Sequence, residues 1–164
     1  LLDQTVKELK GEKAEEAKSE INLRVDIRIP ETYLPQINLR LNLYKRISSV
    51  DDLAEVDRIK EEIKDRFGPL PGSVENLLKY GAVKHLAQKI QLRAIDRIGN
   101  RLVLKFSPAG LADVAGFTRF LKKRSGALTP QGILTLPLAS DPDAAVMEET
   151  LSVLKELYSY NIMN

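Results

Sequence analysis

The chain has 164 residues, 43% of them hydrophobic and 29% charged, which are the proportions of an ordinary globular protein with one core. Its 25 basic and 23 acidic residues leave a net charge of only +2, which argues against a dedicated nucleic-acid clamp because such domains are usually clearly basic. The absence of cysteine excludes disulfides and thiolate metal sites, and no apolar run reaches the roughly 18 residues of a membrane span.

The first twenty residues are predicted to form a connecting segment ahead of the domain. Apolar spacing predicts a short helix over residues 1–10, which Gly11 ends. Charged residues and alanines dominate residues 12–20, which we interpret as a solvated linker. Because the sequence opens without Met inside an apolar-periodic stretch, we interpret the chain as a fragment from the C-terminal side of a longer protein. Residues 21–164 are then expected to form one domain.

The next segment has the period of a strand. Apolar and polar residues alternate strictly from Ile21 to Ile29, and five apolar positions at period two predict a half-buried strand that Pro30 ends.

Two helices are predicted between Tyr33 and Gly72. Pro35 is compatible with the first turn of the first helix, because its missing N–H would have no partner there. The apolar stripe of this helix is wide, so we expect the helix to be packed on two sides. The stripe consists of Ile37, Leu41, Tyr44 and Ile47, flanked by Leu39 and Leu43.

The second of these helices has a clean apolar stripe and a charged opposite face. Ser49 with Asp52 is expected to cap its start, and Gly68 with the prolines after it ends it. The stripe consists of Leu53, Val56, Ile59, Ile63 and Phe67. The opposite face carries Asp57, Arg58, Glu61, Glu62 and Asp65.

The remaining elements alternate between helices and short strands. A third helix is predicted from Gly72 or Ser73, with a close approach of another element at Gly81. The segments 91–98 and 101–106 are predicted to form a hairpin with a type II′ turn at Gly99.

A shorter helix after Pro108 ends at Gly126. Strands at 127–129 and 133–136 and a last helix capped by Asp141, with Pro142 at its first position, complete the chain. The tally of five or six helices and about five short strands predicts an α+β fold, in which the helices pack around a small, largely antiparallel sheet.

Catalytic motifs are missing from the sequence. It has no phosphate-binding glycine loop and no H-E-x-x-H, and its single histidine, His85, precludes a His-based metal site. We interpret His85 as a packed or hydrogen-bonded residue at the edge of the third helix. We therefore expect no catalysis, metal or cofactor in this chain.

The candidate binding residues are carboxylates on the second helix. Glu62 and Asp65 lie at i and i+3, so both project from one face just before the helix ends, and Glu61 is adjacent. One interpretation is a solvated face with Lys60 and Lys64 as local partners. The other is an acidic docking patch for a basic surface, where charge sets specificity and association rate more than affinity.

A competing interpretation is an auxiliary nucleic-acid-binding module. It uses basic residues of the hairpin and of the short helix after Pro108, and its test is steeply salt-dependent DNA binding. These residues are Arg93, Arg97, Arg101, Lys105 and Lys122–Arg124. The three at the end of the helix are also expected from the helix dipole alone.

Two blocks carry a resemblance to a known family. They run from Tyr33 to Ile47, including Leu43-Tyr44-Lys45-Arg46-Ile47, and from Asp65 to Pro71, which reads Asp-Arg-Phe-Gly-Pro-Leu-Pro. Together with the following helix they resemble the C-terminal regulatory domain of bacterial transcription-repair coupling factors. The opening residues 1–20 resemble the segment that connects this domain to an upstream motor.

The resemblance implies a non-catalytic regulatory role inside a large DNA translocase. ATP and Mg²⁺ would act only in the motor domains of the parent, through which it contacts DNA. The domain would dock on the UvrB-like N-terminal module of the same chain and mask UvrA recruitment until stalled RNA polymerase is engaged. Glu62 and Asp65 match positions that face basic residues of that module. The implied setting is cytoplasmic, without a membrane, and we expect the fragment to be monomeric.

Overall fold

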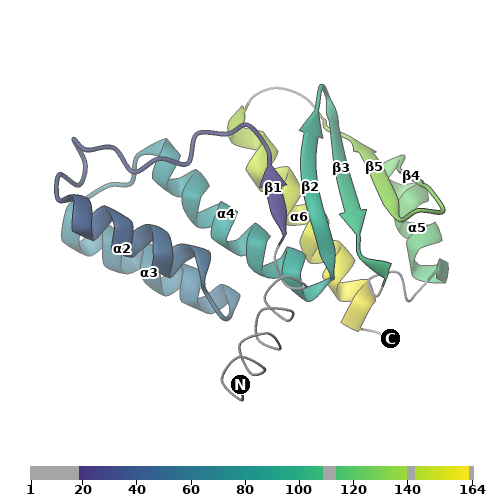
Figure 1. The fold of residues 1–164 in the computed structure, drawn as a ribbon, viewed down its shortest axis with the longest axis horizontal. Coiled ribbons are helices and arrows are strands. Elements are labelled where there is room, and N and C mark those ends of the chain that lie inside the picture. The colour runs from purple at the N-terminus through teal and green to yellow at the C-terminus, as the bar shows by residue number, and fades with distance from the viewer. Residues whose placement is uncertain (1–18, 109–113, 140–142, 163–164) are drawn as a thin grey trace, which may run out of the picture. The chain divides into compact units, whose positions relative to one another are not determined.

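The structure, a computed structural model, describes residues 19–108, 114–139 and 143–162 (Figure 1). The chain divides into two compact units, which we name by their content. The sheet unit comprises residues 1–22, 87–138 and 157–164, and the helical unit comprises residues 23–86 and 139–156. The described part holds five helices and five strands, which confirms the α+β class. The single domain over 21–164 stays a prediction, and the expected helix at 1–10 and the cap at Asp141–Pro142 lie outside the described residues.

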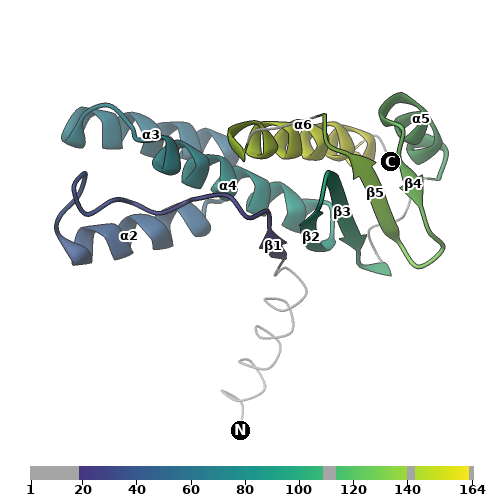
Figure 2. The ribbon, with the colours of Figure 1, turned by 90° about the horizontal axis from the view of Figure 1, so that it is seen from above.

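The sheet unit is built on five strands, of which β1 is parallel to β2 while the other neighbours are antiparallel. The sheet is therefore largely antiparallel, as predicted. The spatial order is β1 (Glu20–Asn22), β2 (Leu92–Ile98), β3 (Arg101–Phe106), β5 (Ile133–Pro137) and β4 (Ala127–Leu128). Helix α5 (Val114–Arg124) lies beside this sheet (Figure 2). The rings of Phe106 in β3 and Phe117 in α5 meet edge to face with centroids 5.3 Å apart.

The predicted hairpin between β2 and β3 is confirmed. Ile98 pairs with Arg101 across the Gly99–Asn100 loop. Of the two loop residues only Gly99 has a positive φ, +59°, as a type II′ turn requires. Three alternate β3 side chains are buried in the core, namely Leu102, Leu104 and Phe106.

The predicted strand over residues 21–29 is mostly wrong. Burial does alternate along the segment, and Leu23 and Ile29 are buried. Only Glu20–Asn22 pairs with the sheet, however, because Arg24 has φ +58°, which lies outside the β region. The period of two therefore predicts the alternating burial of the side chains in this segment, but it does not predict the hydrogen bonding of the backbone.

The helical unit packs α2 (Ile37–Ser48), α3 (Leu53–Phe67) and the first parts of α4 (Gly72–Lys89) and α6 (Asp143–Ile162). Figure 1 shows α2 and α3 as a helical hairpin. The core takes Ile47 from α2, Ile59 and Ile63 from α3, and a buried ladder along α4. That ladder consists of Val74, Leu77, Leu78 and Ala82. Burial of this apolar surface is the main stabilising term of the unit.

The predicted burial of α2 is wrong in two respects. Ile37 and Leu41 are 60% and 59% exposed, so this part of the expected stripe faces solvent, and the buried residues are Leu43 and Ile47. The helix is therefore packed on one side. Pro35 does not lie in the first turn either, because the helix begins at Ile37 and Gln36 occupies the N-cap position.

A close approach at Gly81 positions α2 against α4, as predicted. A Cβ added at Gly81 would lie 2.7 Å from both Cγ2 and the carbonyl oxygen of Ile47. Ordinary contacts between heavy atoms begin near 3.5 Å. Only glycine therefore lets the two helices come this close.

The C-terminal part of the sheet unit follows the prediction with one omission. The strands β4 and β5 and the turn between them are confirmed, since the Gly132 N–H donates to the Thr129 carbonyl at 3.0 Å. Phe120 of α5 was not expected in the core and is fully buried. Ser125, directly after α5, takes a left-handed conformation with φ +54°.

Candidate functional site

The candidate carboxylates of α3 face solvent because the opposite side of this helix packs in the core. Val56, Ile59 and Ile63 are buried, so the face opposite them is left in solvent. The helix is capped by Asp52, whose side chain accepts from the Glu55 N–H at 2.7 Å. The expected pairing of Ser49 with Asp52 is wrong, since the Ser49 hydroxyl donates to the Lys45 carbonyl instead.

The exposed face of α3 carries a row of three carboxylates. Glu61 and Asp65 are exposed, and Asp57, one turn before Glu61, is exposed as well. Spacing of i, i+4 and i+8 places them along one line of the helix. The sequence interpretation missed Asp57 as a member of this row, although its spacing could have indicated it. We call Asp57, Glu61 and Asp65 the acidic row.

The acidic row has no ion-pair partner among the described residues. Lys60 and Lys64, which were expected to neutralise this face locally, form no ion pair in the described part of the chain either. The carboxylates of the row are therefore free to meet a basic surface without the loss of an existing pair.

Unlike Glu61 and Asp65, Glu62 forms an ion pair with a residue of another helix. Its two oxygens accept from the Arg46 guanidinium of α2 at 2.6 and 3.3 Å, and Arg66 lies 3.9 Å away. The hydrogen bond from Arg46 is the main reason that the pKa of Glu62 lies below its usual value. The carboxylate and the guanidinium are each a little over one third exposed. Glu62 therefore joins α3 to α2, which sequence spacing could not indicate.

The end of α3 is held by an aromatic pair. Gly68 ends the helix with φ +95°, and its carbonyl accepts from the Tyr33 hydroxyl at 2.8 Å. The rings of Tyr33 and Phe67 meet edge to face with centroids 6.2 Å apart, and the Arg66 guanidinium lies 5.0 Å from the Phe67 centroid. These contacts fix the turn that carries Asp65.

The basic residues of the hairpin do not form one surface. Pairing across the strands puts Arg101 and Lys105 on one face, together with Ile98 and Ala94. Arg97 pairs with Leu102 and lies on the opposite face. The Lys105 ammonium also lies 3.8 Å from Asp96. The register therefore favours the nucleic-acid interpretation less than the sequence did.

Three other possibilities concern the described residues, namely a role for His85, a metal site and a membrane-spanning helix. His85 is half-buried on α4, which agrees with its interpretation as a boundary residue. Across residues 19–108, 114–139 and 143–162, no three His, Cys, Asp or Glu side chains are grouped as ligands of a metal ion. Within the same ranges no helix has the length and apolar character to cross a bilayer.

Comparison with known proteins identifies the family. A family model described as the TRCF domain matches residues 23–117, more than half of the chain. The chain belongs to the TRCF domain family. The matched range includes α2, α3, α4 and the β2–β3 hairpin, and hence the acidic row.

Named relatives agree with this assignment. The transcription-repair-coupling factor of Haemophilus influenzae is 33% identical over 129 residues, which are 75% of this chain and 11% of the relative. That of Rickettsia bellii is 39% identical over 94 residues, or 57% of this chain and 8% of the relative. The chain thus spans only about a tenth of the length of these relatives.

A solved structure agrees with the fold. The crystal structure of the C-terminal domain of a transcription-repair coupling factor superposes with a TM-score of 0.78 at 24% identity, and the match covers 87% of this chain and 92% of that one. At this identity the likeness concerns the fold, which is again α+β.

Proposed function

We propose that this TRCF domain is a non-catalytic regulatory domain of a DNA-translocating transcription-repair coupling factor. It docks on the UvrB-like N-terminal module of the same protein and masks UvrA recruitment until stalled RNA polymerase is engaged. Family membership supports the setting. The observation that carries the docking proposal is the exposed, unpaired state of Glu61 and Asp65 on α3.

The free carboxylates suit docking better than Glu62 does. A basic surface that meets Asp65 or Glu61 breaks no ion pair within the domain. A surface that meets Glu62 competes with Arg46, whose hydrogen bond to it measures 2.6 Å. We therefore assign the direct contacts to Glu61 and Asp65. Glu62 contributes mainly by fixing α3 to α2 and by adding negative charge to the same end of the helix.

The proposed contact has an expected physical signature. Exposed charges act through the association rate and are screened by salt over a Debye length of about 10 Å at 0.1 M. Docking through the acidic row should therefore weaken as salt rises. Each exposed ion pair contributes little to the free energy of binding. The domain can therefore also be released from the N-terminal module.

The test is binding of the 164-residue chain to the isolated N-terminal module, measured on a biosensor at two salt concentrations. The double variant Glu61→Lys/Asp65→Lys should bind on the order of tenfold more weakly, mainly through a slower association rate. The control is Asp51→Lys, which reverses an exposed carboxylate ahead of the Asp52 N-cap and outside the row. Equal binding of the double variant and the control, with both folded, would rule out the acidic row as the docking surface.

A further inference from the structure

The docking carboxylates adjoin a charged pair that joins α2 to α3, which Figure 1 shows side by side. The Arg46 guanidinium of α2 donates from both of its terminal nitrogens to the two carboxylate oxygens of Glu62, at 2.6 and 3.3 Å. This two-pronged geometry is the one that arginine forms best with a carboxylate. Arg66 also approaches Glu62, but at 3.9 Å it is too far for a hydrogen bond. Arg46 is therefore the group that holds the Glu62 carboxylate.

Glu62 lies on the same stretch of α3 as the two carboxylates assigned to docking. Glu61 precedes it directly, and Asp65 follows three residues later. Side chains at i and i+3 of a helix are neighbours, with Cβ atoms about 5–6 Å apart, so a basic surface that contacts Asp65 is within reach of Glu62 as well. Glu61 and Asp65 form no ion pair in the described part of the chain. Glu62 is thus a third carboxylate of this surface, and Arg46 of the same domain already occupies it.

The pair can open without disturbing the helices that it joins. The Arg46 and Glu62 side chains are 38% and 39% exposed, so neither becomes a buried, unpaired charge when they separate. A partly exposed ion pair also contributes little net free energy. The position of α2 depends on a different contact, since the fully buried Ile47 lies against Gly81 of α4. Glu62 can therefore exchange Arg46 for a cation of a partner at small cost.

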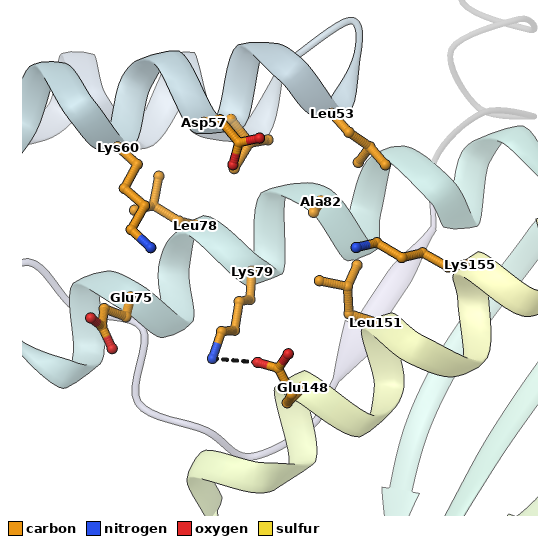
Figure 3. A pocket seen from close by; sticks show the side chains of 11 residues that line it. Leu53, Asp57, Lys60, Glu75, Leu78, Lys79, Ala82, Glu148, Leu151 and Lys155 are labelled. Atoms are coloured by element: carbon orange, nitrogen blue, oxygen red, sulfur yellow. Dashed lines mark ion pairs between the residues drawn. The ribbon is translucent and has the colours of Figure 1, made fainter.

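A second pair between helices of the same unit provides a comparison. The Lys79 ammonium of α4 lies 2.7 Å from a carboxylate oxygen of Glu148 in α6, and Figure 3 shows the two side chains pointing toward each other. Lys79 is half-buried and Glu148 is exposed, so this pair too is open to solvent. It adjoins a groove whose lining includes neither Glu61 nor Asp65. Removal of the lysine would therefore free a carboxylate away from the two that are assigned to docking.

We propose that Arg46 competes with a basic side chain of the N-terminal module for Glu62, and that this competition limits how tightly the domain docks. The inference rests on the proposed function, to which it adds a residue that sets the affinity. While Arg46 holds Glu62, the module contacts only Glu61 and Asp65. When the module supplies a cation to Glu62, the Arg46 guanidinium turns into solvent, and it recovers Glu62 when the module leaves. Arg46 therefore favours the released state of the domain.

The test is binding of the 164-residue chain to the isolated N-terminal module on a biosensor, with variants that alter the hold on Glu62. Arg46→Gln should bind about two- to fivefold more tightly than the wild type, which is the range that a partly exposed ion pair allows. Arg46→Lys keeps the charge but cannot donate to both oxygens in the same fork, so it should also bind more tightly, by a smaller factor. Most of the gain of Arg46→Gln should be lost in the Glu62→Gln background.

The matched control is Lys79→Gln, which removes one positive charge and frees one carboxylate elsewhere in the same unit, and it should bind like the wild type. Circular dichroism checks that every variant is folded. Four results would overturn the inference and leave docking itself intact: no gain in Arg46→Gln, a gain that Arg46→Lys does not share, an equal gain in Lys79→Gln, or an undiminished gain in the Glu62→Gln background. Absence of docking by the wild type and by every variant would instead overturn the proposed function, and the inference with it.

Discussion

Replacement of Gly81 by alanine tests how closely α2 and α4 must approach. Two effects of opposite sign compete at this position. Alanine is favoured over glycine inside a helix by about 1 kcal/mol. The new Cβ would, however, lie 2.7 Å from Cγ2 and from the carbonyl oxygen of Ile47. A side-chain methyl can rotate away, but the carbonyl cannot, so α2 itself must move.

The steric effect should win. Overpacking of this kind costs about 1–3 kcal/mol, so after the gain of about 1 kcal/mol in helix propensity we expect Gly81→Ala to lower the free energy of unfolding by up to about 2 kcal/mol. The assay is urea unfolding followed by circular dichroism. The control is Gly72→Ala at the start of α4, where a Cβ meets nothing within 4 Å and no loss is expected. A Gly81→Ala variant more stable than the wild type would refute the close approach of the helices.

Three further predictions concern side chains whose burial, capping role or ion pair sets their contribution to stability. Phe67→Ala should cost about 2 kcal/mol, because Phe67 is half-buried, whereas Phe120→Ala should cost about 3–5 kcal/mol because Phe120 is fully buried; urea unfolding separates the two. Asp52→Ala removes the N-cap of α3 and should cost about 1 kcal/mol by the same assay. The Arg46–Glu62 pair should contribute no more than about 1 kcal/mol, since both groups are partly exposed. Because the pKa of Glu62 is lowered in the folded state, this contribution is present above the unfolded pKa and is lost as pH falls through the folded pKa, so wild type and Glu62→Gln should converge in stability in acid.

Features set by local chemistry were predictable from the sequence. The apolar stripe of α3 follows from its period: Val56, Ile59 and Ile63 are buried as expected, whereas Leu53 and Phe67 at its two ends are half-buried. The β2–β3 hairpin follows from Gly99, whose positive φ few other residues adopt readily. The close approach at Gly81 was also indicated, since a glycine inside a helix is unfavourable unless a neighbour requires it.

Features set by tertiary contacts were not predictable. Apolar residues surround much of α2, so its period alone cannot choose the buried arc. That arc is chosen by the contact of Ile47 with Gly81 and by the hydrogen bond from the Ile29 N–H to the Tyr44 hydroxyl at 2.6 Å. Ile37 and Leu41 are left exposed as a result.

In the candidate site, too, features set by local spacing were predictable and features set by tertiary contacts were not. Amphipathic spacing correctly indicated that Glu61, Glu62 and Asp65 lie away from the buried stripe of α3. The pairing of Glu62 with Arg46 joins residues 16 positions apart on different helices, and i, i+4 reasoning extends only along one helix. The structure thus separates a carboxylate that holds two helices together from two that are free to bind a partner.

UvrA capture by the full-length parent protein tests the central proposal most directly. The wild type, Glu61→Lys/Asp65→Lys and Glu62→Lys/Asp65→Lys would be compared in the absence of RNA polymerase, with Asp51→Lys as the control. If the domain masks the UvrA-recruiting surface by docking through α3, both double variants should capture UvrA more strongly than the wild type, and the control should match the wild type. Capture by the double variants at the wild-type level, with the domain still folded, would contradict the account.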